Sequence, residues 1–177
     1  FQKVIQRWFA DYDQFKHIYE MYFQTIYTKQ TLAFNFLSLA QALDSYTNIY
    51  CRNLLQSGEI NKAYKKFGDR ILVLLKSFVE IRGNLSLQNF TKAIVETRHA
   101  ISHGDSKQEK EKNPFCYEDN DLRMLFFGAK MILSAVFLRK IGFSDEKIYE
   151  SLKNNGRFGN IVVGKYKFEE KKIEKVK

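Results

Sequence analysis

The stretch from Leu87 to Gly104 reads LQNFTKAIVETRHAISHG and has the period of a helix that is apolar on one face. Its apolar-face positions recur at intervals of three or four residues: Phe90, Ile94, Thr97 and Ile101. Ser86 is suited to the N-cap position, and Gly104 to the left-handed residue that ends many helices. The stretch therefore predicts a helix that is capped at both ends and packed through one face.

Helical periodicity continues through most of the chain. The 177 residues contain only one proline and nine glycines, so long intervals lack the residues that break helices. The apolar spacing predicts helices over 4–27, 32–55, 59–81, 87–103, 122–141 and 145–152. Asp11 or Asp13 is expected to break or cap the first of them. We therefore expect an all-α fold, a bundle of about five or six helices.

We expect three parts along the chain. Residues 1–30 form an aromatic amphipathic helix that packs on the bundle, 31–155 form the bundle, and 156–177 form a C-terminal extension with a basic tail. Apolar and polar residues interleave over 158–168, which predicts a short strand or hairpin. The sequence begins at Phe1, inside an apolar and aromatic pattern, so we expect an upstream domain in a longer protein.

The composition limits the class of partner. Twenty-nine Lys and Arg against 20 Asp and Glu give a formal charge of +9, which favours a polyanion such as RNA, DNA or an anionic membrane surface. The most apolar run, 125–138, is shorter than the roughly 20 residues of a membrane span and contains Lys130. The N-terminus lacks a signal-peptide pattern. We expect a cytoplasmic protein with no membrane partner.

The cations of the expected helix 59–81 and of the residue that follows it have two interpretations. They do not all fall on one side of a helix: Lys62, Lys65, Lys66, Arg70, Lys76 and Arg82. Lysine-rich faces are most often only solvated, and we favour that interpretation here. A patch that follows the phosphates of a nucleic acid is the alternative.

A cation and imidazoles combine at the end of the expected helix 87–103, where Arg98, His99, Ser102 and His103 stand. Guanidinium matches paired phosphate oxygens, and imidazole is suited to proton transfer. RNA supplies its own nucleophile, the 2′-hydroxyl, so cleavage needs only proton transfer and stabilisation of a pentavalent transition state. Arg98 and His103 are about 140° apart around the helix, yet both can reach one cleft from its end or from two copies.

The sequence does not indicate a site for a metal or a cofactor. His99 and His103 have the spacing of a zinc metalloprotease helix, but that motif needs Glu after the first His, and Ala100 stands there. Cys51 and Cys116 lack metal-ligand spacing, so we expect reduced thiols with structural roles. The glycines are scattered and form no phosphate-binding loop. We expect neither metal nor cofactor.

One acid of the expected helix 32–55 calls for a partner. Asp44 follows Ala40 by four residues, so its carboxylate projects from the edge of the apolar face. Because a partly buried carboxylate without a partner is costly, this position predicts a nearby cation. An acid that lies on the helix surface is an equal alternative.

The segment from Arg98 to His103 resembles the signature of HEPN domains, helical nucleases and binding modules of prokaryotic defence systems. That signature is Arg, a polar residue, three to five more residues, then His, and His99 fills the polar position. The wider resemblance is to the HEPN domain at the C-terminal end of ApeA-like anti-phage proteins. It covers roughly 4–141 in three blocks: Arg7-Trp8-Phe9, FLSLAQALDSY over 36–46, and Thr97 to Gly104.

The resemblance implies a bundle that forms a homodimer in which two Arg/His motifs face one composite cleft. It implies a metal-independent endoribonuclease that leaves a 2′,3′-cyclic phosphate and acts as an abortive-infection effector on RNA, with transfer RNA one candidate. Arg98 and His103 would be catalytic, His99 would orient or bind substrate, and Ser102 and Asp44 would support them. Asp44 stands where we would expect Glu in such proteins, which leaves its role less certain.

Two other functions remain open. A HEPN module without catalytic activity would bind RNA, a nucleotide or a protein partner. A structural dimerisation domain would hold Arg98 and His103 as satisfied structural residues, with Asp44 as the partner of the arginine.

Overall fold

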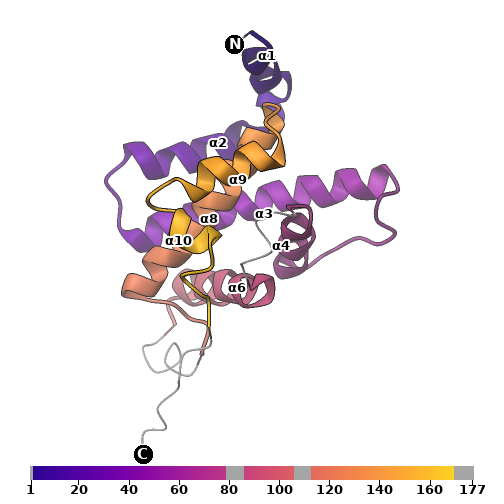
Figure 1. Cartoon of the computed structure of the whole chain (residues 1–177). Helices are drawn as coiled ribbons and strands as arrows, with labels where there is room; N and C mark the ends of the chain where they lie inside the picture. The colour runs from indigo at the N-terminus through magenta and orange to yellow at the C-terminus, as the bar shows by residue number, and fades with distance from the viewer. Residues whose placement is uncertain (1, 79–85, 106–112, 170–177) are drawn as a thin grey trace, which may run out of the picture.

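The computed structural model describes residues 2–78, 86–105 and 113–169, and this part of the chain contains eight helices and no strand (Figure 1). The bounds of the helices are α1 Gln2–Ala10, α2 Tyr12–Tyr27, α3 Leu32–Gln56, α4 Phe67–Lys76, α6 Leu87–His103, α8 Asp119–Lys140, α9 Asp145–Lys153 and α10 Gly159–Val162. The all-α prediction is confirmed, although the described helices outnumber the five or six that we expected. None of them is long and apolar enough to cross a membrane.

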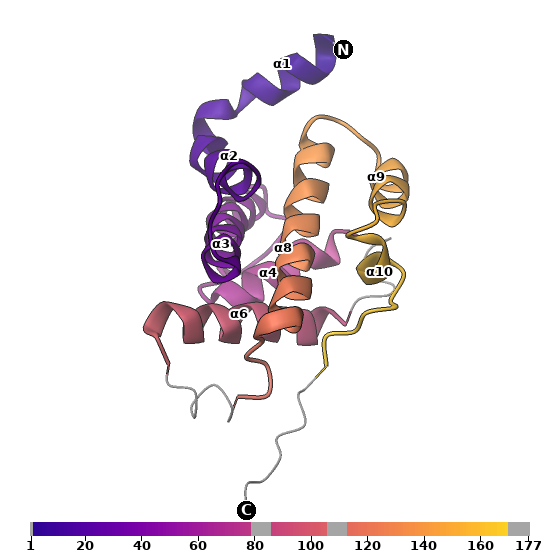
Figure 2. The same ribbon diagram turned by 90° about the vertical axis from the view of Figure 1, so that its left-hand side faces the viewer.

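α3 lies at the centre of the bundle. It contacts α2, α4, α6 and α8, and α9 and α10 lie on the far side of α8 from it (Figure 2). α8 is buried on almost every side, which agrees with its nearly continuous apolar sequence. The largest fully buried side chains come from α2, α3, α4, α6, α8 and the loops: Phe36, Phe78, Phe90, Phe168, Ile18, Leu39, Leu43, Ile71, Leu74, Leu75, Ile94 and Leu125. Burying a side chain of this size contributes about 1.5–3 kcal/mol.

The predicted N-terminal helix is divided in two at Asp11, one of the two positions expected to break or cap it. Asp11 has a non-helical backbone with φ of −125° and ψ of 22°, and its carboxylate pairs with Lys140 at the end of α8. α1 projects beyond the end of α2 and has no buried residue (Figure 1). It still contacts the bundle, because the Trp8 ring stacks on Tyr19 with ring centroids 4.4 Å apart.

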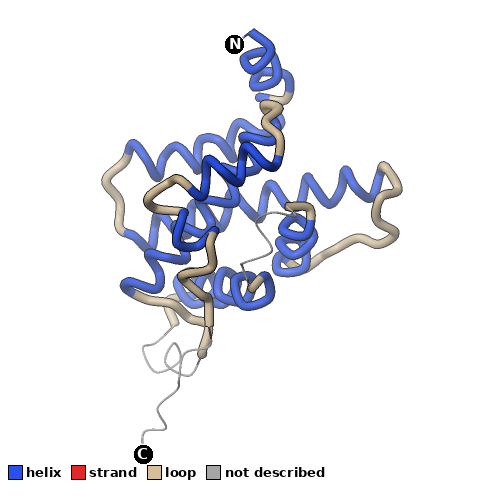
Figure 3. The backbone as a smooth tube through the Cα atoms, viewed as in Figure 1, coloured by secondary structure: helices blue, strands red, loops and turns tan. Residues whose placement is uncertain are grey.

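The predicted helix over 59–81 is wrong at its start. α4 begins only at Phe67, and a long loop joins it to α3 (Figure 3). The guanidinium of Arg70 donates to the carbonyl oxygens of Tyr64, at 3.3 Å, and Lys65, so these carbonyls bind a side chain instead of the amides of a continuing helix. α4 ends at Lys76, and residues 79–81 of the prediction lie outside the described residues.

The predicted strand over 158–168 is also wrong. Residues Gly159–Val162 form one helical turn, α10, and the following chain to 169 has no regular structure. Phe158, Ile161 and Val162 are buried, and their spacing of three and four residues places them on one side of that turn. The ring of Phe168 packs on the ring of Phe90, with centroids 4.9 Å apart. The last residues of the predicted basic tail, 170–177, lie outside the described residues.

The hydroxyl of Thr97 holds the chain that precedes α8 against α6. Thr97 is fully buried; its Oγ1 donates to the Phe115 carbonyl oxygen at 3.1 Å and accepts from the Tyr117 amide at 2.9 Å. The amide nitrogen of the Asn113 side chain donates to Glu96 at 3.0 Å, one residue before Thr97. These bonds fix the backbone beside the C-terminal half of α6.

We predict that Thr97→Val destabilises the fold by about 2–6 kcal/mol, because it removes the hydroxyl that binds two buried backbone groups, and each lost bond costs about 1–3 kcal/mol. Thr91→Val is the matched control on the same helix. The Thr91 hydroxyl is buried without a hydrogen-bond partner, so its removal should be neutral or stabilising. Urea unfolding followed by circular dichroism measures both changes. Equal losses of stability in the two variants would contradict this account of the segment 113–117.

Candidate functional site

A cavity of about 290 Å³ lies beside the last turns of α6. It is lined by Phe67, Val95, Arg98, His99, Ser102 and His103. Four of the five residues that the sequence singled out therefore line one cavity, and the fifth, Asp44, contacts Arg98 from α3. Phe67, at the start of α4, supplies a wall that comes from another helix.

The helical period explains why these residues meet. Val95, Arg98, His99 and Ser102 have offsets of zero, three, four and seven, so they form one stripe on α6 that is distinct from its buried stripe. His103 follows in the last turn before Gly104, which has the left-handed φ of 65° expected of a C-cap. The amide of Asp105 donates to the Ala100 carbonyl oxygen at 3.0 Å, which completes the cap. The predicted cap at Gly104 is confirmed.

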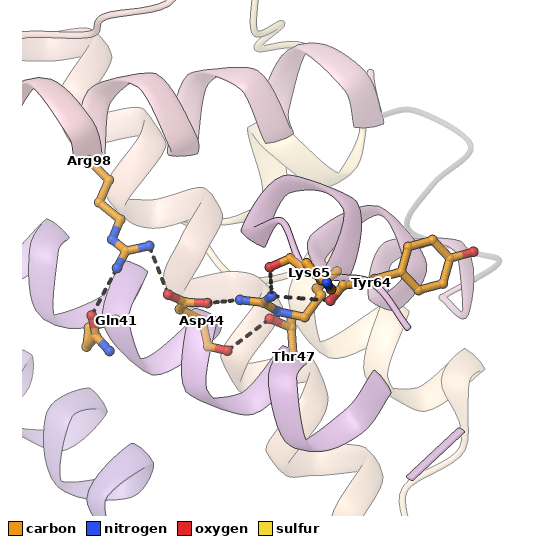
Figure 4. Close-up of polar contacts among 7 residues, drawn as sticks. Gln41, Asp44, Thr47, Tyr64, Lys65 and Arg98 are labelled. Atoms are coloured by element: carbon orange, nitrogen blue, oxygen red, sulfur yellow. Dashed lines mark hydrogen bonds and ion pairs between the residues drawn. The ribbon is translucent and has the colours of Figure 1, made fainter. Parts of the chain in front are cut away.

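Arg98 is held by two acceptors on neighbouring turns of α3 (Figure 4). Its Nη1 donates to Asp44 Oδ2 at 2.9 Å, and its Nη2 donates to Gln41 Oε1 at 3.2 Å. The pairing of Asp44 with a cation that the sequence predicted is present, and the surface alternative is wrong because the Asp44 side chain is only 20% exposed. The guanidinium carbon of Arg98 also lies 4.9 Å from the centroid of the Phe67 ring, within the range of a cation–π contact.

Asp44 has a second cationic partner. Arg70 Nη2 donates to Asp44 Oδ1, so the two carboxylate oxygens bind two different guanidiniums. Arg70 is more buried than Arg98, with side chains 11% and 28% exposed respectively. Asp44 therefore joins α3 to both α4 and α6, and only the outer of its two arginines reaches the cavity.

The two histidines lie beside each other in the lining of the cavity. His99 and His103 have ring centroids 4.3 Å apart and an angle of 43° between their planes. Both are exposed, as is Ser102, so a ligand can reach them without moving the core. Figure 2 shows the C-terminal end of α6 at the edge of the bundle. The cavity thus combines a fixed guanidinium, two accessible imidazoles and a hydroxyl.

Sequence reasoning missed Gln41, Phe67 and Arg70. Gln41 precedes Asp44 by one helical turn, and this polar pair at the edge of an apolar stripe was a usable signal. Phe67 is one apolar residue among many in the sequence, and Arg70 was expected on a solvated face. Their spacing of three residues places them on one side of α4, but no local pattern indicates that this side meets Asp44 and Arg98.

Other titratable groups of the described chain do not add to the cavity. Within residues 2–78, 86–105 and 113–169, no three His, Cys, Asp or Glu side chains are placed to hold a metal ion. Cys51 and Cys116 are both buried. Burial raises the pKa of the Cys51 thiol, and the charge of nearby Arg70 acts in the opposite direction. A raised pKa favours the unreactive thiol form, which agrees with a structural role.

A model of the Apea-like HEPN family matches residues 18–147, well over half of the 177-residue chain. The match includes every residue that lines the cavity, together with Gln41, Asp44 and Arg70. Neither a search of curated proteins nor a search of solved structures found a match.

We predict that Asp44→Asn lowers the free energy of unfolding by about 1–3 kcal/mol, because it leaves two neighbouring guanidiniums without their shared carboxylate. In an Arg98→Ala background, Asp44→Asn should lower the free energy of unfolding by a smaller amount. The change should still be unfavourable, because Arg70 loses its carboxylate partner. Glu150→Gln, at an exposed position of α9, is the control and should be close to neutral. Urea unfolding of the four members of the double-mutant cycle measures the coupling, and strictly additive costs would contradict the ion pair.

Proposed function

Because the chain belongs to the Apea-like HEPN family, we propose that it is a metal-independent endoribonuclease whose site is the cavity at the end of α6. The proposal rests mainly on a difference between two side chains that line the same cavity: one is held in place and the other is exposed. Arg98 is oriented by Asp44, Gln41 and Phe67, whereas His103 is exposed and free to meet a substrate. A fixed cation beside an accessible proton carrier suits cleavage of a phosphodiester.

In the proposed reaction the 2′-hydroxyl of RNA is the nucleophile. The imidazole of His103 accepts the hydroxyl proton while the oxygen attacks the adjacent phosphorus. The bond from phosphorus to the 5′-oxygen breaks, and that oxygen takes a proton, which leaves a 2′,3′-cyclic phosphate and a 5′-hydroxyl. Arg98 offsets the charge that develops on the pentavalent phosphorus. Its bonds to Asp44 and Gln41 use two of its five N–H donors, so others are available for phosphate oxygens.

We further propose that two copies of the chain form the complete site. The second proton transfer needs another titratable group, and the partner's His103 would supply it in a twofold pair, with His99 and Ser102 of each chain orienting the RNA. His99, Ser102 and His103 are exposed. The C-terminal end of α6, which carries them, lies at the edge of the bundle, and this supports the arrangement because a second copy can approach it (Figure 2). In this proposal the protein is an effector of anti-phage defence that acts on cellular RNA.

One observation favours the structural alternative. Arg98 already has a carboxylate partner, and a dimerisation domain would use the same ion pair only to join α3 and α6. That function gives no reason for two adjacent exposed imidazoles on the same cavity, and for this reason the nuclease is preferred.

We predict that His103→Ala and Arg98→Ala each lower the single-turnover rate of RNA cleavage by at least about 100-fold, the usual contribution of a proton-transfer group or of a transition-state donor. His17→Ala is the matched control, since His17 is exposed on α2 and does not line the cavity. The rate is read from labelled RNA on a denaturing gel, with thermal melting to verify the fold. Wild-type rates in both cavity variants would exclude the catalytic assignment and leave the binding or structural function.

We also predict that cleavage is indifferent to EDTA, because the proposed reaction draws its nucleophile from RNA and its charge stabilisation from Arg98. The measurement compares initial rates with and without a chelator at constant ionic strength. A rate that falls with EDTA and returns with a divalent ion would mean that the chemistry is metal-assisted.

A further inference from the structure

We infer that the loop residues Lys62, Lys65 and Lys66 form a cationic track that holds the RNA backbone as it enters the cavity. The inference rests on the proposed nuclease function. It replaces the solvated-face interpretation of these lysines, which assumed that they belong to a helix. They lie instead in the irregular loop between α3 and α4 (Figure 3). All three are exposed.

The track continues directly into the wall of the cavity. Lys66 is the N-cap residue of α4, and the next residue, Phe67, lines the cavity and lies under the guanidinium of Arg98. Consecutive Cα atoms are about 3.8 Å apart, so the backbones of Lys65 and Lys66 are within about 8 Å of that of Phe67. An RNA strand whose phosphate binds at Arg98 would therefore have its neighbouring phosphates within reach of these long side chains.

Arg70 fixes the loop and the site with one side chain. Its guanidinium donates to the carbonyl oxygens of Tyr64 and Lys65 and to Asp44, the same carboxylate that orients Arg98 (Figure 4). The loop is thus held by the ion pair that organises the cavity, although its residues are not helical. A surface fixed before binding loses less conformational entropy when a ligand binds.

The three ammonium groups are available for an anion. In the described part of the chain no carboxylate pairs with Lys62, Lys65 or Lys66, and the Lys62 ammonium lies 5.2 Å from the centroid of the Tyr64 ring. The nearby acid Glu59 accepts a hydrogen bond from the Ser57 hydroxyl at 2.7 Å. Unpaired lysines beside a phosphate-binding arginine favour a nucleic-acid backbone, whose affinity comes largely from such contacts.

The test compares two pairs of substitutions that remove the same charge. Lys65→Gln/Lys66→Gln changes the track, and Lys147→Gln/Lys153→Gln changes two exposed lysines of α9, on the far side of α8 from α3 (Figure 2). Binding of a single-stranded RNA oligonucleotide of mixed sequence is measured by fluorescence anisotropy in a His103→Ala background, over about 50–200 mM salt. The slope of log affinity against log salt should become shallower by about 1.4 in the track variant, since each lost phosphate contact on a single strand accounts for about 0.7. The α9 variant should keep the original slope.

Steady-state cleavage gives an independent readout in chains that retain His103. The track variant should raise KM and leave kcat within about twofold, because the lysines hold the strand away from the scissile phosphate. If the track variant matches the α9 variant in both salt slope and KM, or lowers kcat with KM unchanged, the track is excluded. That result would leave the nuclease in place as long as His103→Ala stays inactive, whereas full cleavage by His103→Ala would refute the proposed function itself.

Discussion

The interaction that organises this molecule is the double salt bridge of the Asp44 carboxylate. One oxygen binds Arg98 from α6 and the other binds Arg70 from α4, while Asp44 itself belongs to the central helix α3. Three helices that are far apart in sequence are thereby joined at one half-buried point. Because one negative charge faces two positive charges, the cluster keeps a net positive charge next to the cavity. Such an excess attracts a phosphate, while the geometry keeps Arg98 from turning toward solvent.

The same interaction links local backbone structure to the candidate site. Arg70 binds carbonyl oxygens of the loop that precedes α4, so this loop, the ion pair and the cavity wall at Phe67 form one continuous structure. On the other side of α6, the buried hydroxyl of Thr97 likewise binds a neighbouring segment and fixes its backbone at residues 115 and 117. The exposed histidines therefore stand on a helix whose two flanks are both held in place.

Sequence reasoning succeeded where the cause of the structure is local. The bounds of α6 follow from apolar spacing and from Gly104. For Asp44, the cost of an isolated carboxylate at the edge of an apolar face indicated a cationic partner as one of two equal alternatives, and the structure has that partner. It failed where contacts between residues far apart in the sequence determine the structure. In the loop 57–66 the carbonyls of Tyr64 and Lys65 bind Arg70, and the buried ring of Phe168 packs on Phe90; no pattern within either segment indicates these partners. Arg70 was missed for the same reason.

The division of the chain into parts 1–30, 31–155 and 156–177 stays a prediction, as do the roles of Arg98, His99, Ser102 and His103. The chain belongs to the Apea-like HEPN family, and the cleavage of RNA by attack of the RNA's own 2′-hydroxyl is our proposal for its site. The most direct measurement is mass spectrometry of the ends of RNA fragments made by the purified protein. We expect 2′,3′-cyclic phosphate and 5′-hydroxyl ends, and we expect both to be absent with His103→Ala. Fragments with 3′-hydroxyl and 5′-phosphate ends would show that another nucleophile attacks the phosphorus, and would contradict the proposed reaction.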